Sequence, residues 1–131
     1  MGTRAVYTFI DEDEEERHSI YKHWDGYPTW ACRFIANALP LAWPLPRFEA
    51  KEFAAAFVAA NKKQAGHIYL TSRPGVHRDL AYTYEIRGQD GQLEVRIFKV
   101  RYHGPGYCWA EYQPLFKGTL EDAYLFASTY N

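Results

Sequence analysis

The sequence contains few of the residues that build metal sites and covalent cross-links. Its 131 residues include two cysteines, Cys32 and Cys108, which stand far apart, and one methionine. Neither cysteine belongs to a Cys/His spacing of the kind that binds zinc. We therefore predict no metal site and no disulfide framework, and we expect both thiols to be buried.

Long apolar runs are absent as well. No stretch approaches the roughly 18 apolar residues that a membrane-spanning helix needs. The opening segment "MGTRAVYTF" lacks the basic flank and apolar core of a signal peptide. These absences predict a cytoplasmic protein that does not enter a membrane.

The common signatures of cofactor and nucleotide chemistry are missing too. The chain has no phosphate-binding loop of the Walker type, no Rossmann glycine pattern, no G-x-S-x-G elbow and no H-E-x-x-H motif. We predict no cofactor, and we regard a binding role as a better hypothesis than catalysis.

What the chain does have is aromatic surface. Hydrophobic residues make up 47% of the sequence and aromatic residues 18%, including 11 tyrosines. A chain of this length and hydrophobic content predicts one domain, residues 1–131, with its own core. Tyrosine suits sheet and contact surfaces, because its ring is apolar while its hydroxyl seeks a partner.

The periodicity predicts an α+β fold. Residues 4–10 alternate as a strand, and residues 18–24 form a second strand that closes an N-terminal hairpin. Helices are predicted over 28–39 and 47–66, and further strands over 67–72, 80–100 (a hairpin around Asp90-Gly91) and 107–113, where Pro114 ends the last one. Thr119 caps a final helix. We therefore expect an antiparallel sheet of five to six strands with about three helices on one face.

Charge is concentrated in one run. The segment "DEDEEE" holds six of the 16 acidic residues, so 10 remain elsewhere against 15 basic residues. One interpretation is a solvated hairpin loop. The other is an acidic finger that binds a basic partner through these side chains: Asp11, Glu12, Asp13, Glu14, Glu15 and Glu16.

The segment "SIYKHWDGYPTW" gathers the remaining candidates for chemistry. If the hairpin is roughly symmetric, Arg4 lies beside Trp24 and Asp25, and His23 and Asp25 share a strand face. His23 could then act as a base that Asp25 orients. The candidate ligand site comprises Thr3, Arg4, His23, Trp24, Asp25 and Tyr27. An Arg4–Asp25 ion pair that only stabilises the fold is the competing interpretation.

The same residues carry a resemblance. "MGTR" followed by "YKHWDGYP" resembles a family of small uncharacterised bacterial, prophage and phage proteins that begin Met-(Gly/Ser)-Thr-Arg and continue with Tyr-x-His-x-Asp-Gly-Tyr-Pro. The resemblance covers about the first 30 residues and implies no established activity. It implies a mobile-element setting, in which small proteins often act by binding a host factor.

Two functional hypotheses follow from these observations. The first is a phage-type binding module that occupies a host protein or a protein–nucleic-acid complex, as an anti-defence inhibitor of the anti-CRISPR kind would. The second is a nucleotide- or phosphate-binding protein, or a hydrolase, with its pocket at Arg4, His23, Asp25 and Tyr27. Basic and aromatic residues near Lys99 and Arg101 raise nucleic-acid binding as a weaker option. A homodimer is compatible with either hypothesis.

Overall fold

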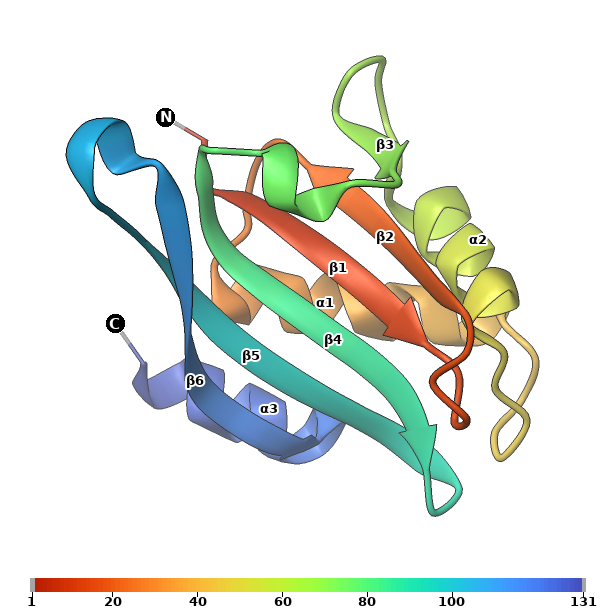
Figure 1. Ribbon diagram of the computed structural model, residues 1–131. Coiled ribbons are helices and arrows are strands. Elements are labelled where there is room, and N and C mark those ends of the chain that lie inside the picture. Colours follow the sequence, from red (N-terminus) through yellow and green to blue (C-terminus); the bar gives the residue numbers. More distant parts are fainter. Residues whose placement is uncertain (1, 131) are drawn as a thin grey trace.

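The structure, a computed structural model, describes residues 2–130 as one mixed sheet with three helices on one of its faces (Figure 1). The strands are β1 (Arg4–Ile10), β2 (Arg17–Lys22), β3 (Ile68–Thr71), β4 (Leu80–Gln89), β5 (Gln92–His103) and β6 (Trp109–Thr119). The helices are α1 (Pro28–Ala38), α2 (Ala50–Asn61) and α3 (Leu120–Thr129), and short 3-10 turns occur at η1 (Leu39–Leu41), η2 (Pro74–Val76) and η3 (Pro105–Tyr107). The predicted α+β class is confirmed.

The sheet has the strand order β3-β2-β1-β4-β5-β6, and one pairing departs from the antiparallel expectation. β1 pairs antiparallel with β2, as the predicted hairpin requires, but parallel with β4. Since β3 is antiparallel to β2, β3 and β4 also run in the same direction. The connection between them, residues 72–79, must therefore return along the sheet. It does so across the face that carries no helix (Figure 1).

The core lies between the sheet and the helices because β1 alternates. Ala5, Tyr7 and Phe9 point toward the helices and are fully buried. The Tyr7 ring centroid lies 4.7 Å from that of Phe57 in α2, and the Phe9 ring lies 5.6 Å from Phe53. These contacts account for the four-residue spacing of the two phenylalanines in α2, which places them on one helix face.

Several predicted boundaries shift for identifiable reasons. β2 ends at Lys22 rather than at residue 24, because Asp25 adopts a positive φ of 60° in the turn that follows. α2 is shorter than the predicted 47–66: the chain leaves the helix at Lys62, whose Nζ donates to the Ile68 carbonyl 2.8 Å away. β6 continues through Pro114, which an edge strand tolerates beside a bulge.

Other local predictions hold. The Asp90-Gly91 turn between β4 and β5 has positive φ at both residues, as a type I′ hairpin requires. Thr119 Oγ1 accepts a hydrogen bond from the Asp122 N–H at the start of α3. Cys32 is buried as expected, whereas Cys108 is exposed beside the β5–β6 turn, so the expectation of two buried thiols is wrong for Cys108.

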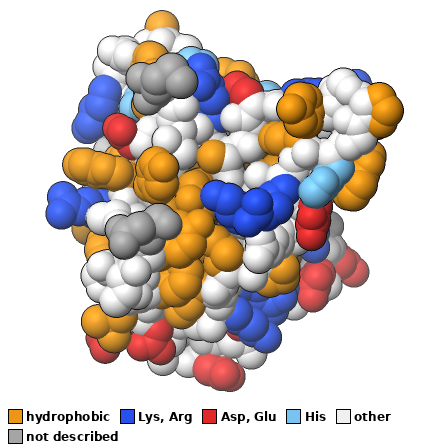
Figure 2. All heavy atoms as spheres, turned by 90° about the vertical axis from the view of Figure 1, so that its left-hand side faces the viewer, with side chains coloured by type: hydrophobic (Ala, Val, Ile, Leu, Met, Phe, Trp, Pro, Cys, Tyr) orange, Lys and Arg blue, Asp and Glu red, His pale blue; other side chains and the backbone are white. Residues whose placement is uncertain are grey.

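The β5–β6 hairpin projects beyond the helices at the same end of the molecule as the end of α3 (Figure 1). Viewed from that side, hydrophobic side chains form a continuous area with Lys and Arg side chains beside it (Figure 2). Across residues 2–130, no helix combines the length and the apolar character needed to cross a membrane.

Candidate functional site

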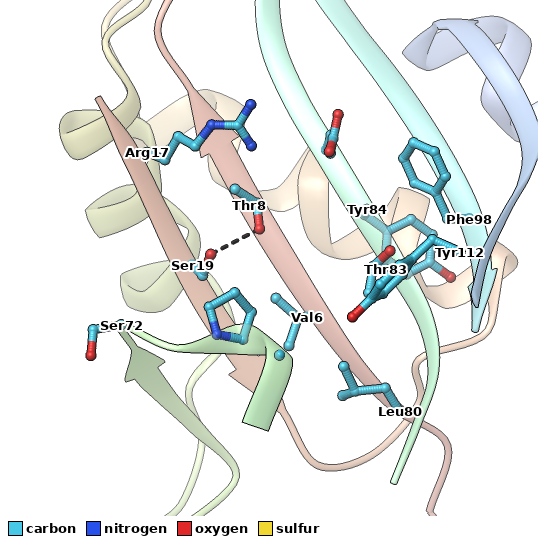
Figure 3. A pocket seen from close by; sticks show the side chains of 13 residues that line it. Val6, Thr8, Arg17, Ser19, Ser72, Leu80, Thr83, Tyr84, Phe98 and Tyr112 are labelled. Carbon is cyan, nitrogen blue, oxygen red and sulfur yellow. Dashed lines mark hydrogen bonds between the residues drawn. The ribbon is translucent and has the colours of Figure 1, made fainter. Parts of the chain in front are cut away.

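A hollow of about 440 Å³ opens on the helix-free face of the sheet (Figure 3). We call it the sheet-face hollow, and its lining includes Val6, Thr8, Arg17, Ser19, Ser72, Pro74, Leu80, Thr83, Glu85, Phe98 and Tyr112. Pockets that take a ligand commonly measure about 300–1,000 Å³. The sheet-face hollow is therefore the candidate binding site.

The topology explains why the hollow exists. Strands β1, β2 and β4 supply its floor, and the returning connection 72–79 with η2 rises as one wall. Phe98 of β5 and Tyr112 of β6 form the opposite wall (Figure 3). The hollow is thus the trough between a crossover connection and the far pair of strands.

Along the strands the lining changes from apolar to charged. Leu80 lies at the end where β4 begins, and Val6 pairs with Thr83 at the next level. Further along, Thr8 Oγ1 and Ser19 Oγ share a hydrogen bond of 2.8 Å. Arg17 lies beyond Ser19, at the far end. An occupant would meet an apolar end, a hydroxyl-lined middle and a charged end.

The lining of the hollow consists mostly of hydroxyl-bearing and apolar side chains. In the described part of the chain, the residues around the hollow include no histidine, cysteine or lysine. A hydroxyl needs an adjacent base to become a nucleophile, and the hydroxyls of Thr8 and Ser19 are paired with each other. The hollow offers hydrogen bonds and apolar contact, and the carboxylate in its lining, Glu85, is paired with Arg87 at 3.3 Å.

Ion pairs fill the charged end. Arg87, whose side chain is only 9% exposed, lies 3.4 Å from Glu14, 3.3 Å from Glu85 and 3.8 Å from Glu94. Glu14 also lies 3.5 Å from Arg17. Because a buried guanidinium needs carboxylate partners, this cluster fixes the acidic loop against the end of the hollow.

The acidic run is therefore partly a structural loop. Asp11 Oδ1 accepts a hydrogen bond of 2.6 Å from the Ala50 N–H at the start of α2. Glu14 is held by arginines, and Glu16 lies 3.1 Å from His18. Glu12 and Glu15 are exposed and have no ion-pair partner within residues 2–130. These two, with Asp13, are the exposed carboxylates of the run that form no ion pair within residues 2–130.

The sequence-predicted ligand site is only partly assembled. Arg4 and His23 do lie together, with Nη2 and Nε2 3.4 Å apart. The ion-pair partner of Arg4 is Asp79 at 3.1 Å, not the expected Asp25. Because Asp25 lies in the turn beyond β2, the interactions found for residues 2–130 include no hydrogen bond between it and His23. The proposed His23–Asp25 orientation is not formed.

The other members of that predicted site have structural contacts. The Thr3 carbonyl accepts a 2.8 Å hydrogen bond from the Gly26 N–H. The Trp24 carbonyl accepts from Lys22 Nζ at 2.6 Å. Tyr27 precedes the first residue of α1 and is half exposed, with its ring against Tyr82. These contacts join the first residues of the chain to the turn at 23–27.

Arg4, His23, Tyr21 and Asp79 form a closed cycle, which we call the Arg4 cycle. The Tyr21 hydroxyl donates to Asp79 Oδ2 at 3.0 Å, so its oxygen accepts from His23 Nδ1–H at 3.1 Å. The other imidazole nitrogen, Nε2, is then free to accept from Arg4. Burial, together with the Asp79 carboxylate, raises the pKa of Tyr21 to about 12.

The cycle secures the wall of the sheet-face hollow. Asp79 ends the returning connection, and His77 in the same connection stacks on Tyr21 with ring centroids 4.5 Å apart. The motif residues of β1 and β2 therefore hold a segment that is distant in sequence. Asp79 is the partner that lies outside the motif, and the sequence alone does not show that it comes close to Arg4 and Tyr21.

Lys22 is a second unusual feature of the motif. Its side chain is fully buried, and Nζ lies 3.0 Å from His67 Nε2 and 4.0 Å from the centroid of the Phe34 ring. Burial lowers the pKa of Lys22 to about 8. It also lowers the pKa of His67, and the Lys22 charge adds to this effect. Since Lys22 is fully buried and His67 is its half-buried partner, we assign them to the fold and not to the binding site.

Sequence reasoning missed the residues of the hollow itself. Thr8, Ser19 and Thr83 occupy the polar positions of alternating strands, which is the only sequence signal they give. Phe98 and Tyr112 carry no motif. His, Cys, Asp and Glu side chains within residues 2–130 form no group of three that could hold a metal ion.

Comparison of the chain with protein-family models, with curated proteins and with solved structures finds no match.

Proposed function

We propose that this chain is a cytoplasmic binding module, and that the sheet-face hollow with the adjoining acidic loop takes a segment of a partner protein. The observation that carries the proposal is that the sheet-face hollow and the acidic loop form one continuous surface. Arg17 lines the hollow and lies 3.5 Å from Glu14 of the acidic run. An apolar anchor and a charged rim in one surface are the usual composition of a protein-binding site.

The chemistry of the surface specifies the segment. Leu80, Val6 and Phe98 suit an apolar side chain of the partner, and the hydroxyls of Ser19 and Thr83 suit its backbone amides. The solvent-facing carboxylates of Glu12 and Glu15 favour Lys or Arg beside that anchor, because opposite charges steer association. The partner segment is therefore basic with at least one large apolar residue.

The setting of the proposal comes from the resemblance of the N-terminal motifs to phage and prophage proteins. In that setting the partner is a host protein, and occupying it would inhibit a defence system. A basic segment is common in proteins that bind nucleic acid, which agrees with a partner that works on DNA or RNA.

The first test locates the contact. A photoreactive benzoylphenylalanine replaces Tyr112 in the wall of the hollow, and in a control it replaces Leu125, which is 63% exposed on α3. After irradiation in nuclease-treated host lysate, we expect a protein adduct from position 112 and not from position 125. Equal adducts from both positions would refute the assignment of the site.

The second test uses the captured protein after purification. Ser19→Trp fills the hollow, and calorimetry should show at least a tenfold loss of affinity. Lys117→Trp adds the same ring outside the hollow and should leave the affinity within about twofold. A partner that binds the Ser19→Trp variant as tightly as the parent protein does not use the hollow.

A second candidate remains a nucleotide or phosphate ligand at Arg4, His23, Asp25 and Tyr27. The observation in its favour is the approach of Arg4 to His23. Such a ligand must compete with the present partners of Arg4, which are Asp79 at Nε, the Gly2 carbonyl at Nη1 and His23 at Nη2. NMR titration with ATP and with inorganic phosphate tests it: shifts at Arg4 and His23 that His23→Ala abolishes would support this candidate, and their absence would reject it.

A further inference from the structure

A second surface lies on the helix side of the β5–β6 hairpin, away from the sheet-face hollow. Lys99, Arg101 and His103 alternate along β5 and so point to the same side. Their cross-strand partners are Gln113, Glu111 and Trp109. This is the end of the molecule that Figure 2 faces, where basic side chains lie beside a continuous hydrophobic area.

Two cations of this surface lack carboxylate partners. Within residues 2–130, neither Lys99 nor Arg101 takes part in an ion pair. Arg101 Nε donates to the Gln113 side-chain oxygen at 2.8 Å, which orients the guanidinium without neutralising it. Glu111, opposite Arg101, directs its Oε1 to His103 Nε2 at 2.7 Å.

An exposed aromatic ring lies at each end of the row formed by Lys99 and Arg101. Lys99 Nζ lies 5.3 Å from the centroid of Tyr82, and the half-exposed Tyr27 ring contacts Tyr82 in turn. At the other end Trp109 is 55% exposed, and its indole stacks on His103 with centroids 4.6 Å apart. The stacking and the His103–Glu111 contact fix the indole before any partner arrives.

We propose that Tyr27, Lys99, Arg101 and Trp109 form a binding strip for single-stranded nucleic acid. From Lys99 to His103 the strand rises about 13 Å at roughly 3.3 Å per residue, so the strip accommodates a few nucleotides. Rings at the ends stack on bases, and the cations between them bind phosphates, which is the composition of sequence-tolerant single-strand sites. The proposal does not depend on the function assigned to the hollow.

An acidic peptide is the competing occupant of a cationic surface, and the rings argue against it. Carboxylate side chains need only the two cations, whereas Tyr27 and Trp109 offer flat faces that acidic side chains do not use. A duplex is also disfavoured, because its bases are stacked on one another and cannot stack on protein rings.

The experiment measures fluorescence anisotropy of a labelled oligo(dT) of about 12 nucleotides with the full chain at low salt. The Lys99→Ala/Arg101→Ala double variant should bind at least about tenfold more weakly. Its log–log salt slope should also be shallower by about 1.4, at roughly 0.7 for each lost phosphate contact. Trp109→Ala should weaken binding roughly tenfold without changing the salt slope.

The matched control lies on the same two strands. Arg96 of β5 and Lys117 of β6 face each other on the opposite side of the sheet. Arg96→Ala/Lys117→Ala removes the same charge and should change oligo(dT) affinity by no more than about twofold. Circular dichroism and the melting temperature confirm that each variant folds. If the Lys99→Ala/Arg101→Ala variant does not fold, the measurement is repeated with Lys99→Gln/Arg101→Gln.

Four results would overturn the proposal: no oligo(dT) binding by the parent protein at low salt, equal losses in the two double variants, binding of the corresponding duplex as tight as that of the single strand, or full competition by an oligo-glutamate peptide at the same concentration. The last of these would assign the strip to an acidic protein.

Discussion

The rings of Tyr7 and Tyr84 stack with centroids 4.9 Å apart, yet only one of their hydroxyls has a partner. Tyr84 donates to the Gly26 carbonyl, whereas within residues 2–130 the buried Tyr7 hydroxyl finds no hydrogen-bond partner. Burial raises the pKa of both phenols, so both stay neutral across the physiological range. The two residues are a matched pair for measuring the free energy of one buried hydrogen bond.

We expect Tyr7→Phe to leave the free energy of unfolding unchanged within about 0.5 kcal/mol, or to raise it, because it removes an unpaired polar atom. Tyr84→Phe should lower it by about 1–2 kcal/mol, since the Gly26 carbonyl loses its donor. Urea denaturation of the two variants checks this. A cost for Tyr7→Phe as large as that for Tyr84→Phe would mean that the Tyr7 hydroxyl is paired.

Gly26 should not tolerate a side chain. A Cβ there would lie 2.6 Å from the Thr3 carbonyl oxygen and 2.9 Å from Ala5 Cβ. We expect Gly26→Ala to lower the free energy of unfolding by about 2 kcal/mol or more through this overlap. Gly75 has nothing within 4 Å of such an atom, so Gly75→Ala is the control and should be neutral or slightly stabilising. Equal stability of the two variants would contradict the close approach of the turn to β1.

Asp79→Ala opens the Arg4 cycle. Its carboxylate and the Arg4 guanidinium are 48% and 29% exposed, so the ion pair itself contributes little, and we expect a loss of about 1 kcal/mol. The larger effect should be faster amide hydrogen exchange in residues 72–79, because that connection loses its anchor. Glu12→Ala removes an exposed, unpaired acid and should change neither quantity. Unchanged exchange in the Asp79 variant would mean that η2 is held by other contacts.

Lys22 gives the folded protein a measurable pH dependence. Its pKa is about 8 in the folded chain against 10.5 for an exposed lysine, so between these values the unfolded chain binds more protons. The Lys22 contribution to stability must then rise with pH, by about 1–2 kcal/mol from pH 7.5 to 9.5, while burial raises the pKa of Cys32 to about 11 and offsets part of this rise at the upper end. Above about pH 10 the raised pKa values of the buried tyrosines act in the opposite direction. Denaturation curves of the parent protein and of Lys22→Met test this: the parent should gain stability relative to the variant as the pH rises, and parallel profiles would refute it.

The acidic run separates into structural and exposed members. Asp11→Ala should lower the free energy of unfolding by about 1 kcal/mol, because Asp11 accepts from the first turn of α2. Glu12→Lys/Glu15→Lys should leave stability within about 0.5 kcal/mol and slow association with a basic partner, most clearly at low salt. Stopped-flow kinetics with the captured protein measures the association rate. An unaltered rate would remove the acidic loop from the contact.

Local signals in the sequence were sufficient for most elements. The Asp90-Gly91 turn, the Thr119 cap and the alternation of Ala5, Tyr7 and Phe9 each depend on neighbouring residues only, and each is found in the structure. Register was nearly correct too: Ala5 pairs with Lys22, one position from the expected symmetry. The hairpin that was expected to gather the N-terminal motifs is present.

The candidate site could not be predicted because it depends on one non-local pairing. The alternation of residues 80–89 identifies the two faces of a strand but not the strands that pair with it. The parallel pairing of β4 with β1 therefore could not be predicted. The return of residues 72–79 across the open face follows from that pairing. For the same reason the sequence predicted an ion pair between Arg4 and Asp25, which the hairpin brings close. The observed partner, Asp79, is placed beside Arg4 by the connection 72–79.

The central place of β1 has a consequence for synthesis. β1 can pair with β2 as soon as β2 has been synthesised, but its other edge has no neighbour until β4 emerges. Parallel pairings that join distant segments form slowly and expose the growing polypeptide to aggregation. We expect overproduction of a ribosome-associated chaperone to raise the yield of correctly folded protein, because it would cover β1 until β4 is available.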